Sequence, residues 1–325
     1  AAESDEDWLI DQTEKWCQDR SIFLAIMESI EIIDGKHKDL TKNALPELLS
    51  DALAVSFDTN IGHDYIENSD DRYKFYHREE EHLPFDLEMF NKITKGGLVN
   101  KTLNVALAGT GVGKSLFMCH VAAGALTQMK NVLYISMEMS EERVAERIDA
   151  NLMNVPISQL ENLSKDMFDK KMNAITNKGL GQLIVKEYPT GAANATHFRA
   201  LLGELKLKKD FIPDLICIDY LNICASSRMK ADSGSYTYVK AIAEELRGLA
   251  MENNLPILTA TQTTRGGYDN SDVSLTDTSE SFGLPATADL MFALISTEEL
   301  EERNQIQVKQ LKNRYSDISI NSKFL

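Results

Sequence analysis

The chain has 325 residues, of which 43% are hydrophobic and 26% charged, and its formal net charge is −16 at pH 7. This length provides one large or two medium domains with a substantial core. No apolar run reaches the roughly 18 residues that a membrane span needs, so no membrane partner is expected. The acidity argues against an outer surface built to coat nucleic acid, although a few donors inside a channel would still be compatible with DNA.

The four cysteines are scattered, with no CxxC pair and no His at zinc-binding spacing. This pattern predicts reduced, mostly buried thiols and a cytoplasmic protein. The sequence begins without Met, and we expect it to be a piece of a longer protein.

The first predicted element is an acidic helix over residues 5–34 with an apolar stripe at Trp16, Phe23, Met27 and Ile30. Spacings of 7, 4 and 3 residues place these side chains on one helical face. Such a stripe must be buried, either in the core of its own domain or on a neighbouring subunit. Residues 36–100 are mixed, with helices expected at 46–57 and 87–93 around a polar segment.

From residue 100 onward, predicted strands and helices alternate. Strands are expected at 102–108, 131–137, 182–186, 214–219, 256–261, 290–296 and 305–311. Helices are expected at 114–128, 141–153, 165–177, 195–208 and 236–252. Alternation with apolar strands predicts an α/β fold with a mostly parallel sheet and helices on both faces. The polar stretches 226–235 and 265–279 follow strands and are long enough to indicate functional or disordered loops.

A glycine-rich turn joins the first of these strands to the first of these helices. It contains Gly109, Thr110, Gly111, Val112, Gly113, Lys114 and Ser115. This is the setting of a phosphate-binding P-loop, whose backbone N–H groups and following helix N-terminus surround phosphates. Lys114 would reach the β- and γ-phosphates, and Ser115 would bind Mg²⁺. The strict motif begins with Gly where this chain has Ala108. We therefore expect binding of a nucleoside triphosphate, ATP or GTP, with Mg²⁺.

Other polar residues end predicted strands. Asp219 closes an apolar strand that we expect beside the P-loop strand, where a carboxylate holds Mg²⁺. Glu138 follows the strand after the P-loop helix, where it would either polarise an attacking water or only cap the next helix. Gln262 would sense the γ-phosphate. Alternation places Lys312 and Arg314 on one face of a strand, as functional cations or as a solvated basic patch.

Taken together, these motifs resemble the RecA-type motor domain of the DnaB family of hexameric replicative helicases, in particular its members from T-even-like phages. The similarity is carried by the P-loop and by the runs NKITKGG, NVLYISMEM, RIDAN, VKAIAEELR and GLPATAD. It covers residues 85–320, and residues 5–60 resemble the end of the family's N-terminal region. Three parts are implied: a linker helix at 1–35, a connecting segment at 36–84 and a RecA-like P-loop ATPase domain at 85–325.

The resemblance also implies residue roles. Glu138 corresponds to the catalytic glutamate, Asp219 to the Mg²⁺-associated aspartate and Gln262 to the γ-phosphate sensor. Lys312 and Arg314 correspond to the pair that reaches the ATP of the neighbouring subunit. The central DNA-binding loop corresponds to a segment that contains Asp277, Ser279, Glu280, Ser281, Phe282 and Gly283. Bacterial members carry Arg and Gly where this chain has Ser279 and Phe282, so the resemblance implies the position of the loop but not its side-chain contacts. Contacts from backbone amides to DNA phosphates also fit the acidic composition.

The activity implied is ATP-driven 5′→3′ translocation on single-stranded DNA by a homohexamer, in the bacterial host cytoplasm, with a primase and a helicase loader as partners. One alternative is a RecA-like strand-exchange ATPase that forms filaments. Another is an ATP-gated DNA clamp that does not translocate. A small-molecule kinase would need an Arg-rich lid, and the sequence contains none.

Overall fold

The structure is a computed structural model. It describes residues 6–36, 40, 42–53, 55, 65–66, 68–77, 81–229, 234–263 and 283–325. The chain divides into two units, Ala1–Glu79 and Glu80–Leu325, which are described separately.

The first unit is helical. Its elements are α1 (Glu6–Ile33), the short 3₁₀ helix η1 (Lys42–Ala44), α2 (Leu45–Leu53) and α3 (Ser69–Tyr76). Helix α1 packs against α2, and its buried positions include Ala25 and Ile32. The predicted apolar stripe lies elsewhere on α1: Trp16, Phe23, Met27 and Ile30 are 66%, 53%, 47% and 49% exposed. The helix is confirmed, but this stripe is not covered by the described residues of its own unit.

The second unit contains an eight-stranded sheet in the order β10-β9-β8-β3-β7-β6-β4-β5. The bounds are β3 (Leu103–Ala108), β4 (Val132–Ser136), β5 (Leu183–Glu187), β6 (Leu215–Asp219), β7 (Ile257–Gln262), β8 (Leu290–Ile295), β9 (Gln307–Asn313) and β10 (Lys323–Phe324). Strands β8, β3, β7, β6, β4 and β5 are parallel to one another, whereas β9 is antiparallel to β8 and to β10. A separate hairpin pairs β1 (His82–Leu83) with β2 (Leu98–Val99).

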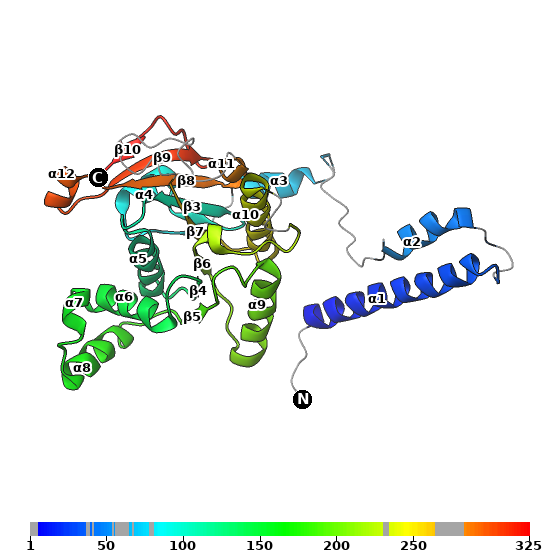
Figure 1. The fold of residues 1–325 in the computed structure, drawn as a ribbon, viewed down its shortest axis with the longest axis horizontal. Helices are drawn as coiled ribbons and strands as arrows, with labels where there is room; N and C mark the ends of the chain where they lie inside the picture. The colour runs from blue at the N-terminus through cyan, green and yellow to red at the C-terminus, as the bar shows by residue number, and fades with distance from the viewer. Residues whose placement is uncertain are drawn as a thin grey trace. The chain divides into compact units, whose positions relative to one another are not determined.

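Helices cover both faces of this sheet (Figure 1). The helices of this unit are α4 (Glu88–Thr94), α5 (Lys114–Thr127), α6 (Glu141–Met153), α7 (Ile157–Leu160), α8 (Lys165–Thr176), α9 (Ala195–Lys209), η2 (Leu221–Ile223), α10 (Ser235–Glu252), α11 (Gly283–Thr287) and α12 (Glu298–Glu302). Helices α7 and α8 pack on α6 and project away from the sheet (Figure 1). Along β3, Val105 and Leu107 enter the core shared with α9 and α10, while Ala106 and Ala108 enter the core shared with α5 and α6. Successive side chains of a strand point to opposite faces of the sheet, so β3 contributes to two cores, one on each face.

The predicted α/β fold with a mostly parallel, helix-covered sheet is confirmed. The cysteines are free, and Cys119, Cys217 and Cys224 are buried while Cys17 is partly exposed. Among the described residues, no helix combines the length and the apolar character needed to cross a bilayer.

Candidate active site

The P-loop leaves the carboxyl end of β3 and enters α5. Gly111 and Gly113 have φ values of 82° and 108°, in the left-handed region that favours glycine. A Cβ added at Gly111 would meet no atom within 4 Å, so the loop borders open space. Gly113 is the N-cap of α5, and no side chain caps the first turn of that helix. The first N–H groups of α5 are therefore available to an anion.

Ala108 occupies the position where the strict motif has Gly. It is the last residue of β3, it is fully buried, and it pairs with Gln262 of β7. Because φ is not positive at this position, a methyl group is compatible with the backbone. The departure from the strict motif leaves the loop geometry intact.

Lys114 begins α5, and its side chain is only 11% exposed. Its Nζ lies 2.7 Å from Glu138 Oε2 and 4.3 Å from the centre of the Tyr220 ring. Glu138 follows β4, and its side chain is 43% exposed. The structure therefore brings the predicted phosphate-binding cation and the predicted catalytic carboxylate into direct contact.

Asp219 ends β6 and is completely buried. The Tyr134 hydroxyl donates a hydrogen bond to its Oδ2 at 3.2 Å. The other oxygen, Oδ1, is buried and has no hydrogen-bond partner. Burial raises the pKa of Asp219, and nearby Ser115 and Lys114 offset part of that rise. A buried carboxylate oxygen without a partner, close to a serine hydroxyl, suits Mg²⁺, which binds one or two protein oxygens together with substrate phosphates.

The expected position of the Asp219 strand was wrong in one respect. Strand β6 does not lie beside the P-loop strand, because β7 separates them. Asp219 still comes near Ser115 because α5 packs over β7 and β6 as well as β3. The order of strands within a parallel sheet depends on the crossover connections. It cannot be predicted from the apolar pattern of the individual strands.

Gln262 ends β7, the intervening strand, and is partly exposed. The adjacent strands β3, β7, β6 and β4 thus end, in that order, at the P-loop, Gln262, Asp219 and shortly before Glu138. Carboxyl ends of parallel strands form one edge of a sheet, and ligands of open α/β sheets bind at that edge. Four groups predicted from separate motifs are therefore gathered at one place.

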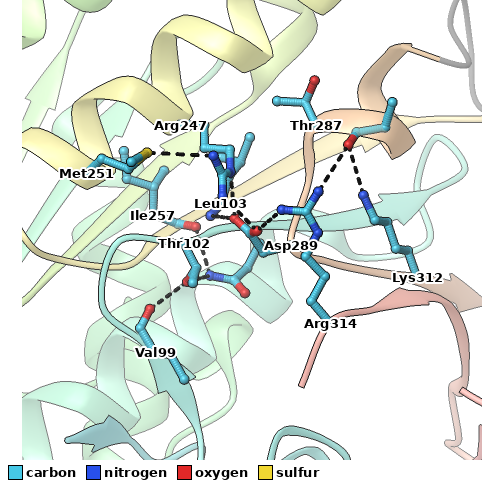
Figure 2. Close-up of polar contacts among 12 residues, drawn as sticks. Val99, Thr102, Leu103, Arg247, Met251, Ile257, Thr287, Asp289, Lys312 and Arg314 are labelled. Carbon is cyan, nitrogen blue, oxygen red and sulfur yellow. Dashed lines mark hydrogen bonds and ion pairs between the residues drawn. The ribbon is translucent and has the colours of Figure 1, made fainter. Parts of the chain in front are cut away.

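Lys312 and Arg314 lie at the other edge. Arg314 donates from Nη1 to Asp289 Oδ1 at 2.6 Å, and Asp289 immediately precedes β8 and also accepts from the Leu103 backbone N–H at 3.0 Å. Lys312 Nζ donates to the carbonyl oxygens of Pro285 and Ala286. Figure 2 shows Lys312 and Arg314 reaching toward the same carbonyl oxygen. At roughly 3.3 Å per residue, β3 holds its two ends about 17 Å apart. The two cations share one face, as predicted, but they cannot reach the P-loop of their own chain.

Most of the predicted DNA-binding segment falls outside the described residues, namely Asp277, Ser279, Glu280, Ser281 and Phe282. Gly283 begins α11 and is buried. Several polar partners at the two edges were not predicted from the sequence: Tyr134, Tyr220, Arg247 and Asp289. Asp289 alone carried a signal, as a carboxylate directly before a fully apolar strand.

The family profile described as "DnaB-like helicase C terminal domain" matches residues 83–322. The chain belongs to the DnaB-like helicase family. A DnaB-like replicative helicase of Enterobacteria phage T4 is 47% identical over all of this chain and 71% of its own length. A probable plasmid replicative DNA helicase of Chlamydia psittaci is 30% identical over 58% of this chain and 41% of its own length.

Two solved structures have the same fold. One, described as an ATPase domain, matches with a TM-score of 0.64 at 16% identity, over 78% of this chain and 93% of that one. The other, a DnaB-like replicative helicase whose interactions with primase were described, matches with a TM-score of 0.63 at 18% identity, over 94% of this chain and 73% of that one. The present helicase is thus a replicative, NTP-hydrolysing enzyme with a RecA-like core.

Proposed function

We propose that this helicase hydrolyses ATP or GTP with Mg²⁺ and moves 5′→3′ along single-stranded DNA as a homohexameric ring, with each nucleotide held between two subunits. The observation that carries the proposal is the separation of the two halves of the site. Lys114, Asp219 and Glu138 meet at the carboxyl edge of the sheet, whereas Arg314 lies at the opposite edge. A second subunit would supply the missing cations.

The proposed roles follow from position and chemistry. The N–H groups of Gly109–Ser115 and the side chain of Lys114 would bind the phosphates, and Gln262 would contact the γ-phosphate. Ser115 and Asp219 would hold Mg²⁺, which neutralises phosphate charge when bound. Glu138 would orient the attacking water. Lys312 and Arg314 of the adjacent subunit would stabilise the charge that develops on the transferred phosphoryl group.

The remaining proposals concern the rest of the assembly. We assign α1 to a linker helix that packs on a neighbouring subunit, residues 36–84 to a connecting segment and residues 85–325 to the motor. We assign DNA contact to the segment that contains Asp277 and Ser279–Gly283. A primase and a loader would be the partners at the replication fork in the host cytoplasm. No observation favours the strand-exchange or clamp alternatives.

A strand-displacement assay tests the function. A forked duplex with a single-stranded 5′ tail should be unwound in the presence of ATP and Mg²⁺, while a duplex with only a 3′ tail should not. The Lys114→Ala variant serves as the control and should unwind neither. ATP hydrolysis stimulated by single-stranded DNA without any unwinding would support a clamp, and unwinding only from the 3′ tail would refute the polarity.

A further inference from the structure

Asp289 is a buried carboxylate at the edge of the sheet that carries Lys312 and Arg314. Its side chain is 5% exposed. Oδ2 accepts from the Leu103 backbone N–H at 3.0 Å and from Arg247 Nε at 3.0 Å. Oδ1 accepts from Arg247 Nη2 at 3.2 Å and from Arg314 Nη1 at 2.6 Å. Figure 2 shows the two guanidinium groups reaching Asp289 from two sides, one from α10 and one from the end of β9.

The cluster contains more positive than negative charge. Lys312 lies next to the two arginines, and its pKa is lowered by burial and then by the charges of Arg314 and Arg247. Asp289 provides one negative charge, so it can neutralise one arginine but not both. One of the two arginines is therefore available to another anion.

The geometry indicates which arginine can leave. Arg247 binds both carboxylate oxygens in a fork, and its side chain is 32% exposed. Arg314 makes one bond to the carboxylate and a long contact of 3.5 Å to the Ala286 carbonyl oxygen, and its side chain is 47% exposed. A pocket of about 300 Å³ lies beside Arg314 and is also lined by Arg247, Met251, Thr287 and Glu244. The Glu244 carboxylate already pairs with Arg228 and Lys240, so the pocket leaves space next to the Arg314 side chain without a free anion among its lining residues to hold it.

We propose that Arg247 is a positioning residue for hydrolysis in the adjacent subunit, because it keeps Asp289 paired when Arg314 turns away to a neighbour's nucleotide. The inference rests on the proposed trans role of Arg314. A buried carboxylate that loses the last cation hydrogen-bonded to it is strongly disfavoured. With Arg247 present, the departure of Arg314 leaves Asp289 with a forked ion pair and a backbone N–H. Without Arg247, Asp289 holds Arg314 in place.

The first test is the Arg247→Gln variant. Its kcat for DNA-stimulated ATP hydrolysis should fall on the order of tenfold or more, while KM for ATP stays unchanged. The reason is that the departure of Arg314 would now leave the buried Asp289 carboxylate without an ion-pair partner. Arg199→Gln is a matched control. Arg199 lies on α9 and makes a forked ion pair with Glu252 of α10, the helix that also carries Arg247, at 2.6 and 2.8 Å. The control variant should leave kcat unchanged. An Arg247→Gln variant with normal kcat would overturn the inference.

A double variant separates positioning from simple loss of structure. Adding Asp289→Asn to Arg247→Gln removes the charge that retains Arg314, so kcat should return toward the parent value. Arg247→Lys keeps a charge but cannot form the fork, and its kcat should lie between those of Arg247→Gln and the parent. If Arg247→Gln fails to fold, the Arg247→Lys variant still tests the inference. A double variant as inactive as Arg247→Gln, with a parental melting temperature, would contradict the mechanism.

Mixed rings provide a readout that structural damage would not produce. Arg247→Gln subunits mixed with Glu138→Gln subunits should recover activity, because some interfaces combine an intact Glu138 with an intact Arg247 and Arg314. Mixing with Arg314→Ala subunits should give no recovery, because both defects lie on the same side of the interface. Recovery in that second mixture would refute the assignment. If Glu138→Gln and Arg314→Ala subunits themselves fail to complement, the proposed trans function fails instead.

Discussion

At the scale of single residues, Lys114 links the two chemical roles of the site, because it contacts the carboxylate that we assign to water activation. ATP would have to draw the ammonium group from Glu138 toward its phosphates. Breaking this ion pair therefore lowers the affinity for nucleotide. The Lys114 side chain of the pair is largely buried, whereas that of Glu138 is partly exposed.

The first prediction concerns this pair. Lys114→Ala should abolish nucleotide binding, because the phosphates lose their cation. Glu138→Gln should bind ATP at least as tightly as the parent, since Lys114 is released, but its kcat should fall by about 10²–10⁴. Titration with a fluorescent nucleotide and an ATPase assay measure the two effects. Glu161→Gln, at an exposed carboxylate after α7, should change neither. Equal loss of affinity in both variants would remove Glu138 from its role.

The second prediction concerns Asp219. Since burial raises its pKa, ionisation of this group costs stability in the folded state. This loss of stability begins as the pH rises above the pKa of Asp in the unfolded chain, about 3.9, and is complete above the pKa of Asp219 in the folded protein. Asp219→Asn should therefore raise the melting temperature, by about 2–4 °C for each kcal/mol of relief, and more at pH 8 than at pH 5.

The same variant should lose Mg²⁺-dependent hydrolysis, because the oxygen that lacks a partner would no longer carry charge. Calorimetry at several pH values and ATPase titration with Mg²⁺ measure the two effects. Asp169→Asn, in a surface pair with Lys165, should leave both unchanged. A melting temperature lowered at pH 8 would show that ionised Asp219 stabilises the fold.

At the scale of elements, the pattern of apolar residues predicted helix and strand bounds closely. Helix α6 was placed at its observed bounds, and β6 began one residue later than expected. Short elements were missed where few side chains define a periodicity, as in α7, α12 and β10. The partners of Asp289 were missed for another reason. Contacts such as Leu103 with Asp289 join residues far apart in the chain, and no local pattern reports them.

The third prediction concerns α1. Its apolar stripe is about half exposed within its own unit, and we propose that a neighbouring subunit covers it. Phe23→Glu combined with Ile30→Glu should leave the helix intact but lower the oligomer mass, because two charges would enter an apolar contact. Light scattering at micromolar concentration and circular dichroism measure these outcomes. Glu31→Gln, an exposed change on the same helix, is the control. A double variant of unchanged mass would place the stripe outside the subunit interface.

At the scale of the whole molecule, the two edges of the sheet predict cooperation between subunits. Arg314→Ala and Glu138→Gln rings should each be nearly inactive, because loss of an arginine finger costs about 10³–10⁵ in kcat. Mixed rings should regain part of the ATPase rate, since some interfaces contain both intact groups. Subunit exchange is checked separately with labelled chains. Mixtures that exchange subunits and stay inactive would place the arginine within its own site.

Strand β3 has a mechanical consequence. It begins at the N–H that anchors Asp289 and ends at the P-loop, and every one of its residues is buried between β7 and β8. An extended strand that is hydrogen-bonded to neighbours on both sides resists changes in its length. Strand β3 therefore connects the two ends of the sheet rigidly. A displacement imposed at one end of β3 would be passed on to the other end. In the proposed ring, this strand of each subunit would couple the nucleotide site at one end of the sheet to the Asp289 cluster at the other.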